Sequence, residues 1–320
     1  MDRPRRRFAR FAVTPDAFRR MALIAVCVLT LTIVSGAAVR LTGSGLGCTT
    51  WPACTSTSVV APLRFHAWVE FGNRLINASV SIASIGMLTA ALARRPRRPD
   101  LTWLSAAMLF GLAAEVVDGG IVVLTKLNPV MVSIHFLLGL VFLAVAVVLH
   151  QRAKIPDTAT SASPMVGRGQ IALARLAMVA LAVVVTLGTV VTSTGPHGGS
   201  PGTPRYHFSL HTVAQLHGSA GEVFLAITLA MLWSLSRSGA PSAVMRRAFI
   251  MLLALVAQAA IGYTQYFSGD PVGIVAFHIA GASILVIASV QYYMGLWNHA
   301  APDGNRGPLA SPPVGAGVRS

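Results

Sequence analysis

Eight apolar stretches, each long enough to cross a bilayer as a helix, dominate this sequence. The first, Met21–Val39, holds 19 residues without a charge, and about 20 helical residues span a hydrocarbon core. Lipid cannot form hydrogen bonds with unpaired backbone N–H and C=O groups, so each stretch is predicted to be an α-helix, which pairs these groups internally. Charged residues make up only 11% of the chain, against about 25% in a soluble domain. The predicted helices cover residues 21–39, 66–93, 101–124, 130–149, 171–192, 210–235, 245–267 and 272–296.

The basic residues predict how these helices are oriented. With the N-terminus inside, inner segments carry 20 Lys and Arg and outer segments carry 4, which is the positive-inside bias. The net charge of +15 therefore reflects topology and does not indicate nucleic acid. We expect a multi-pass protein of the plasma membrane with both termini cytoplasmic. Residues 21–39 are too long for a signal-peptide core of about 7–15 residues, so they are interpreted as a retained helix.

Glycine and proline residues at matching positions divide the eight helices into two halves. Gly36 and Gly188 end the first and fifth helices in the same pattern, 152 residues apart, and Gly120 and Gly262 each precede a proline by nine residues. An even number of helices per repeat makes the halves parallel. The predicted fold is an all-α integral membrane protein made of two parallel-repeat four-helix bundles. The expected segments are a basic cytoplasmic N-terminus (1–20), a first bundle (21–150), a cytoplasmic linker (151–170), a second bundle (171–297) and a disordered cytoplasmic tail (298–320).

Ionisable residues within the helices are the candidates for function, because they are costly in a bilayer. Three of them, His135, His217 and His278, lie six or seven residues from the outer ends of even-numbered helices, and so at one depth. Neutral imidazole suits haem iron, and haem sites in bundles use facing helices. Three buried histidines satisfied by hydrogen bonds are the alternative. The full set is Glu70, Arg74, Glu115, Asp118, His135, His217, Glu222 and His278.

The repeat also predicts a fourth position, which differs between the halves. Asn73 in the second helix aligns with His217 in the sixth. The second half therefore offers a histidine pair for a six-coordinate, electron-transferring haem, while the first offers His135 opposite an asparagine. Such asymmetry suits one structural or redox haem and one reacting haem.

Glu70 lies one turn outward of Asn73 on the same helix face, and Ala214 replaces it in the second half. A carboxylate there is a candidate general acid/base or cation stabiliser, or an ion-pair partner of Arg74. Arg74 is a candidate for holding a haem propionate.

Other residues have open roles at this stage. Glu115 and Asp118 lie in the outer part of the third helix and could line the same cavity or not. Cys48 and Cys54 lie in the first outer loop, where the compartment permits a disulfide. A purely structural disulfide and a redox-active cysteine pair are both open interpretations. Cys27 is expected to be buried and only to pack.

Taken together, several motifs resemble those of the bacterial haem A synthase family, over about residues 20–297. The motifs are Gly43-Ser-Gly-Leu-Gly-Cys-Thr-Thr-Trp-Pro-Ala-Cys54, Val69-Glu-Phe-Gly-Asn-Arg74, Thr125-Lys-Leu-Asn-Pro129 followed by His135, Val213-Ala-Gln-Leu-His217, and Gln258 with Gly262-Tyr-Thr-Gln-Tyr-Phe267, Pro271 and His278.

The resemblance implies an enzyme that oxidises the C8 methyl group of haem O to a formyl group, giving haem A for cytochrome oxidase. Two hydroxylations with water-derived oxygen give a geminal diol that loses water. It implies that the first half binds the substrate haem and the second holds haem b. By position, Glu70 is the catalytic carboxylate, His135 a ligand of the substrate haem, and His217 and His278 the ligands of haem b. It also implies a disulfide between Cys48 and Cys54.

The chain departs from the family at three positions. Asn73 stands where the family has histidine, and Glu115 and Asp118 occupy a helix that is usually uncharged. The competing hypotheses are a non-catalytic dihaem b-type cytochrome and a transporter without haem. By analogy, haem O synthase is a plausible partner; the electron acceptor and a homo-oligomeric state are left open.

Overall fold

The computed structural model describes residues 12–159 and 161–300 and contains eight long helices within them. Each of the eight is long and apolar enough to cross a membrane, which confirms the predicted all-α membrane fold. The helices are α1 (Pro15–Leu41), α2 (Phe65–Ala93), α3 (Pro99–Leu124), α4 (Pro129–Ala153), α5 (Arg168–Thr194), α6 (Leu210–Arg237), α7 (Ser242–Phe267) and α8 (Val272–Met294).

Several of these helices begin with a polar capping residue that is followed by a proline. At the start of α1 the Thr14 hydroxyl accepts a hydrogen bond from the N–H of Ala17, and Pro15 occupies the first turn. At the start of α4 the Asn128 side chain accepts from the N–H of Val130, and Pro129 follows it. These positions favour such residues because the first N–H groups of a helix have no partner within it.

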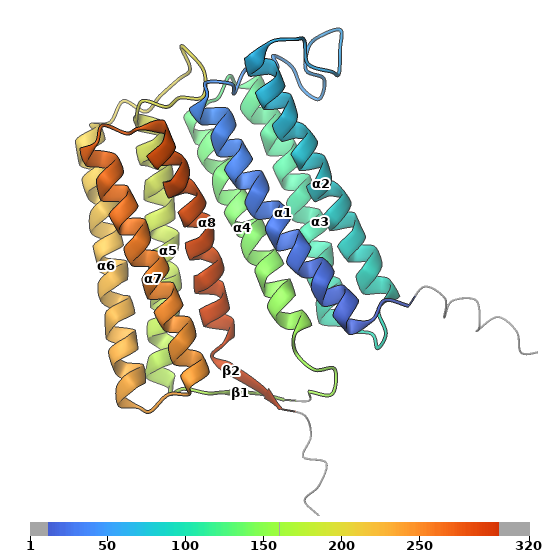
Figure 1. Ribbon diagram of the computed structural model, residues 1–320, viewed down its shortest axis with the longest axis vertical. Helices are drawn as coiled ribbons and strands as arrows, with labels where there is room; N and C mark the ends of the chain where they lie inside the picture. Colours follow the sequence, from blue (N-terminus) through green and yellow to red (C-terminus); the bar gives the residue numbers. More distant parts are fainter. Residues whose placement is uncertain (1–11, 160, 301–320) are drawn as a thin grey trace, which may run out of the picture.

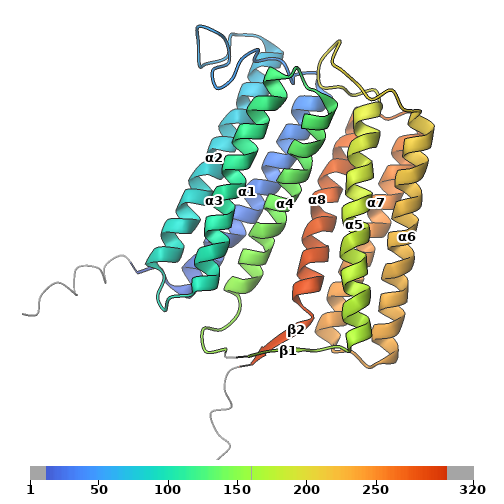
Figure 2. The same cartoon turned by 180° about the vertical axis from the view of Figure 1, so that it is seen from behind.

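The helices form two four-helix bundles that lie side by side, α1–α4 in one and α5–α8 in the other (Figures 1 and 2). Within each bundle, consecutive helices pack as antiparallel pairs: α1 with α2, α3 with α4, α5 with α6, and α7 with α8. The bundles meet mainly through α4 and α8, with further contacts from α1 and α5. This is the arrangement that the sequence repeat predicts.

The densely packed core occupies the end of both bundles at which α1 begins. We call this the inner end of the bundles and the opposite end the outer end, as labels only. One connected cluster of buried apolar side chains extends outward only to Val80 in α2, Leu140 in α4, Phe224 in α6 and Leu285 in α8. The predicted histidine depth lies about one to two helical turns further out on the same helices. The apolar cluster therefore ends before the level of the candidate site.

Large apolar side chains cover the outer surface of the bundles. Ile82, Trp103, Phe110 and Phe277 are each more than 70% exposed, as expected of side chains that face lipid. Cys27 is exposed, so the expectation that it is buried was wrong. The cause is its helix face, because the lipid-facing and interior faces of α1 are both apolar in sequence.

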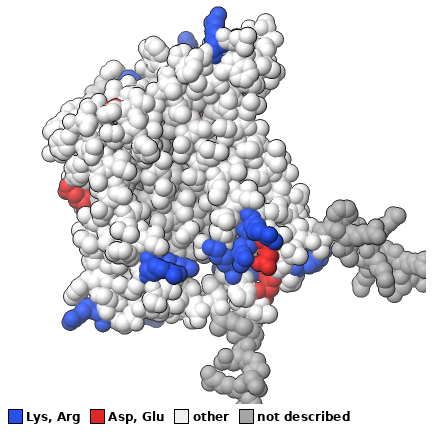
Figure 3. Space-filling view, viewed as in Figure 1, with Lys and Arg blue, Asp and Glu red and all other residues white. Residues whose placement is uncertain are grey.

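The inner face contains a small sheet and a belt of charge. Strand β1 (Ser161–Pro164) pairs antiparallel with β2 (Trp297–Ala300). The expected disordered tail is therefore wrong for residues 298–300, and residues 301–320 lie outside the described part of the chain. Basic residues gather near this end in Figure 3, while the middle of the molecule is almost free of charge. Arg94, 1% exposed, pairs with Asp157 at 2.7 Å and anchors the linker to α2.

Candidate functional site

A polar side chain of each even-numbered helix lies against a glycine of the preceding helix. A Cβ atom at Gly188 would lie 3.0 Å from Cε1 of His217, and one at Gly262 would lie 2.9 Å from Cε1 of His278. In the first half, the corresponding distances are 3.3 Å from Gly119 to His135 Cε1 and 3.9 Å from Gly36 to Asn73 Nδ2. Glycine permits this approach because it has no side chain. We call Asn73, His135, His217 and His278 the histidine layer.

Gly119, and not Gly120, is the counterpart of Gly262. Both Gly119 and Gly262 precede their histidine by 16 residues, and both touch it. Gly120 instead makes room for the indole of Trp51, which a Cβ atom would approach to 2.9 Å. The glycine matched in the sequence was therefore one residue away from the one that contacts the ring.

In the second half, two histidines face each other. The ring centroids of His217 and His278 lie 6.2 Å apart. Two metal–imidazole bonds of about 2 Å each, together with the radii of the two rings, span a similar distance. The carbonyl of Val184 lies 2.9 Å from Nδ1 of His217, so Nδ1 donates and Nε2 remains free to bind iron. His217 and His278 would therefore fit a haem iron bound through both imidazoles.

The first half has one histidine in the layer. Asn73 donates from Nδ2 to the hydroxyl of Ser35 at 2.8 Å, and its Oδ1 accepts from Asn77 at 3.4 Å. Both polar atoms of the Asn73 amide therefore have hydrogen-bond partners within the protein. The site fits a haem iron held by His135 alone.

His135 is flanked by two carboxylates of α3. Its Nδ1 lies 3.1 Å from Oε2 of Glu115 and 3.3 Å from Oδ2 of Asp118. Asp118 is buried and Glu115 is half-buried. The residues that the sequence left undecided thus lie at the layer itself. Within the described ranges, no group of three His, Cys, Asp or Glu is arranged to hold a metal ion.

Glu70 joins the first outer loop to α2. One of its oxygens accepts from the N–H of Cys48 at 2.7 Å, and the other pairs with Arg74 at 2.6 Å. Arg74 also donates to three loop carbonyls, those of Thr50, Pro52 and Ala53. The carboxylate is buried, 5% exposed, beside the Cys48–Cys54 disulfide, which the structure contains. Sequence reasoning foresaw the ion pair with Arg74 but not these loop contacts.

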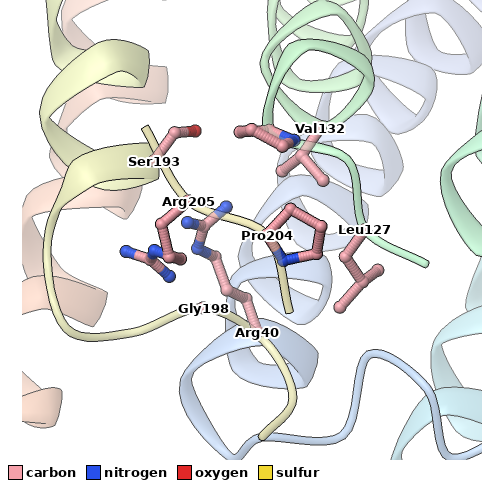
Figure 4. Close-up of a pocket in the computed structure, with 8 residues that line it drawn as sticks. Arg40, Leu127, Val132, Ser193, Gly198, Pro204 and Arg205 are labelled. Carbon is pink, nitrogen blue, oxygen red and sulfur yellow. The ribbon is translucent and has the colours of Figure 1, made fainter. Parts of the chain in front are cut away.

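The outer ends of the two halves are joined by arginine. Arg40 of α1 donates to the carbonyls of His197 and Thr192, each at 2.8 Å, across the junction. Arg205 donates to the same Thr192 carbonyl at 3.0 Å, and Figure 4 shows the two guanidinium groups beside Ser193. Burial lowers the pKa of Arg205. No carboxylate pairs with either arginine in the part of the chain that the structure describes.

These features define a class of protein: a multi-pass membrane protein of two four-helix bundles with a histidine layer near the outer end. The chain belongs to the COX15-CtaA family of cytochrome oxidase assembly proteins, whose pattern it matches over residues 19–197.

Individual relatives agree with this family. The chain is 30% identical over 256 residues to the "Heme A synthase" of Symbiobacterium thermophilum, covering 75% of this chain and 82% of that relative. It is 30% identical over 131 residues to that of Geobacillus kaustophilus, which is 40% of each chain. It is 37% identical over 101 residues to that of Geobacillus thermodenitrificans, 31% of each chain. The matches to the two Geobacillus proteins thus span less than half of their length.

Proposed function

We propose that the chain is a haem A synthase, which oxidises the C8 methyl group of haem O to a formyl group. The observation that carries the proposal is the asymmetry of the histidine layer. The second half pairs two histidines 6.2 Å apart, while the first offers His135, with Asn73 engaged by Ser35. The relatives named "Heme A synthase" support the reaction.

In this proposal the second half holds a resident haem b through His217 and His278. That group would supply a one-electron carrier. The protein's contribution is to fix both rings: Gly188 and Gly262 let them approach, and the Val184 carbonyl orients His217. Substrate haem O binds in the first half, with His135 as its ligand.

Glu70 is the proposed catalytic carboxylate. Conversion of a methyl group and one water to a formyl group releases four protons and four electrons, so a base near the methyl carbon is needed. Glu70 is buried, and its contacts with Cys48 and Arg74 fix its position. The electrons leave through the second half to an external acceptor. We further propose that both termini face the cytoplasm, which places the histidine layer near the outer surface.

Replacing the carboxylate tests this assignment. Glu70→Gln keeps an oxygen that can accept from Cys48 but removes the base, so haem A formation from haem O should fall by about 10²–10⁴-fold. Glu222→Gln is the matched control, because Glu222 is an exposed membrane carboxylate that bonds only to Tyr263 in the described chain. Unchanged conversion in Glu70→Gln would contradict the catalytic role.

Extraction of the bound haems tests the function itself. The purified protein should yield haem b together with haem O or haem A. Haem b alone would favour a non-catalytic dihaem cytochrome, and a preparation without any Soret band would favour a transporter.

A further inference from the structure

His217 and His135 differ in the groups that lie beside their Nδ1 atoms. In the second half, Nδ1 of His217 faces the backbone carbonyl of Val184, a neutral group. In the first half, Nδ1 of His135 faces the carboxylates of Glu115 and Asp118, at 3.1 Å and 3.3 Å. The difference concerns the ring nitrogen that would point away from a bound iron.

His135 is the only ion-pair partner of these carboxylates within residues 12–159 and 161–300. Nδ1 of His135, Oδ2 of Asp118 and Oε1 of Glu115 are all buried there without an aligned hydrogen bond, although Nδ1 lies within 3.3 Å of both carboxylates. Oε1 of Glu115 would lie 3.8 Å from a Cβ atom at Gly139, one turn inward of His135 on α4. Placing a charged side chain at this depth in a membrane costs free energy. Two carboxylates beside one imidazole therefore indicate a functional role.

We propose that Glu115 and Asp118 are positioning residues that hold the Nδ1–H of His135, direct its Nε2 toward the substrate iron, and make it a stronger donor than His217. The inference rests on the proposed function, because it takes haem O as the ligand of the first half. A hydrogen bond from the far nitrogen to a carboxylate fixes the tautomer of a ligating histidine and raises its basicity.

The asymmetry of the layer explains why such a donor is useful in the first half. With Asn73 engaged by Ser35 and Asn77, His135 is the one layer side chain there that can bind iron. A more basic ligand stabilises the oxidised over the reduced iron, so the two carboxylates should lower the midpoint potential of the first-half haem.

The test measures the midpoint potential of the first-half haem and the iron–histidine stretching vibration. The samples are the full chain loaded with haem O, as wild type, Glu115→Gln, Asp118→Asn and the double variant. Loss of such an acceptor typically changes metal affinity by about 10–100-fold. A tenfold loss confined to the ferric state raises a one-electron potential by about 59 mV. We expect a rise of about this size, with a lower vibrational frequency, in the double variant.

Two comparisons separate this role from general damage. Glu222→Gln removes a membrane carboxylate far in sequence from His135 and should change neither readout. The haem b spectrum of the second half reports on folding in each sample, and the single variants serve if the double variant fails to fold. A first-half haem whose potential and vibration match wild type in all variants would overturn the inference.

A measurement without haem O distinguishes the inference from the proposed function. Nitrogen-15 NMR of histidine-labelled protein should show His135 protonated at Nδ1 in wild type, and a mixture of tautomers in the double variant. If wild type shows this tautomer but binds no haem O, the proposed function fails while the positioning contact stands. If His135 carries its proton on Nε2 in wild type, the inference fails whatever haem is bound.

Discussion

At the scale of single residues, position 73 decides how many ligands the first half can offer an iron. The Nδ2 of Asn73 lies 3.9 Å from the site of a Cβ at Gly36, and the homologous positions in the other helices accept a whole imidazole against a glycine. The Asn73→His variant should therefore fit. It should convert most of the first-half haem from a high-spin, one-histidine form to a low-spin, two-histidine form, as measured by electron paramagnetic resonance. An unaltered high-spin signal would show that residue 73 does not face the iron.

The depth of the layer could be predicted from the sequence, but its side-chain contacts could not. Counting residues from the helix ends places His135, His217 and His278 at one level, because rise per residue is constant. The contact between His135 and Glu115 depends on the rotation of α3 about its axis. In a soluble helix, alternation of polar and apolar faces reveals that rotation. Here, lipid and protein interior both select apolar residues, so the signal is missing.

At the scale of elements, a glycine lies against a histidine ring in three of the four helix pairs and allows the two helices to approach there. A methyl group at Gly262 would lie 2.9 Å from the ring of His278, so Gly262→Ala should displace that ring. We expect haem b to bind about 10–100-fold more weakly, by analogy with loss of outer-shell support for a metal ligand. Haem titration of the purified protein measures this.

Gly86→Ala is the control for that variant. Gly86 lies in α2 of the other bundle, and a Cβ atom there would meet nothing within 4 Å. The change should leave haem binding intact and stabilise the helix by up to about 1 kcal/mol. Equal haem affinity in both variants would argue against the packing role of Gly262.

The end of a helix could be predicted from the sequence where a run of charged residues directly follows it. α2 ends at Ala93, directly before the basic run that begins at Arg94, as predicted. α1 begins at Pro15 and not at residue 21, because Arg19 and Arg20 mark the membrane edge while the helix continues into water. The strand pairing of Trp297–Ala300 was missed, since a four-residue edge pair has too little pattern to recognise.

The anchor between the linker and α2 gives a prediction for stability. Asp157→Asn leaves the buried guanidinium of Arg94 without the carboxylate charge that faces it at 2.7 Å, and breaking a buried pair typically costs about 3–5 kcal/mol. Thermal unfolding in detergent should show the loss. The exposed pair Arg19–Asp16 is the control: Asp16→Asn should change stability by about 1 kcal/mol or less. Equal effects would mean that Arg94 is solvated.

At the scale of the whole molecule, Arg40 connects the two bundles at their outer ends. It donates two hydrogen bonds of 2.8 Å to carbonyls of the second half, and bonds to charged groups contribute about 1.5–3 kcal/mol each. Arg40→Gln should therefore destabilise the folded protein by about 3 kcal/mol. Arg64→Gln, which removes an exposed outer arginine at the start of α2, should have little effect on the same thermal transition.

The bundles are thus joined at both ends. At one end Arg40 bonds to the second bundle, and at the other the linker pairs with Arg94 through Asp157 and with β2 through β1. Two fastenings at opposite ends prevent one bundle from sliding past the other along the membrane normal. A bilayer of different thickness is then accommodated by tilt of the whole molecule or by local adjustment of lipid, and not by shear between halves. The height of the first histidine site relative to the second stays constant, so the rate of an electron hop between them should not depend on lipid chain length.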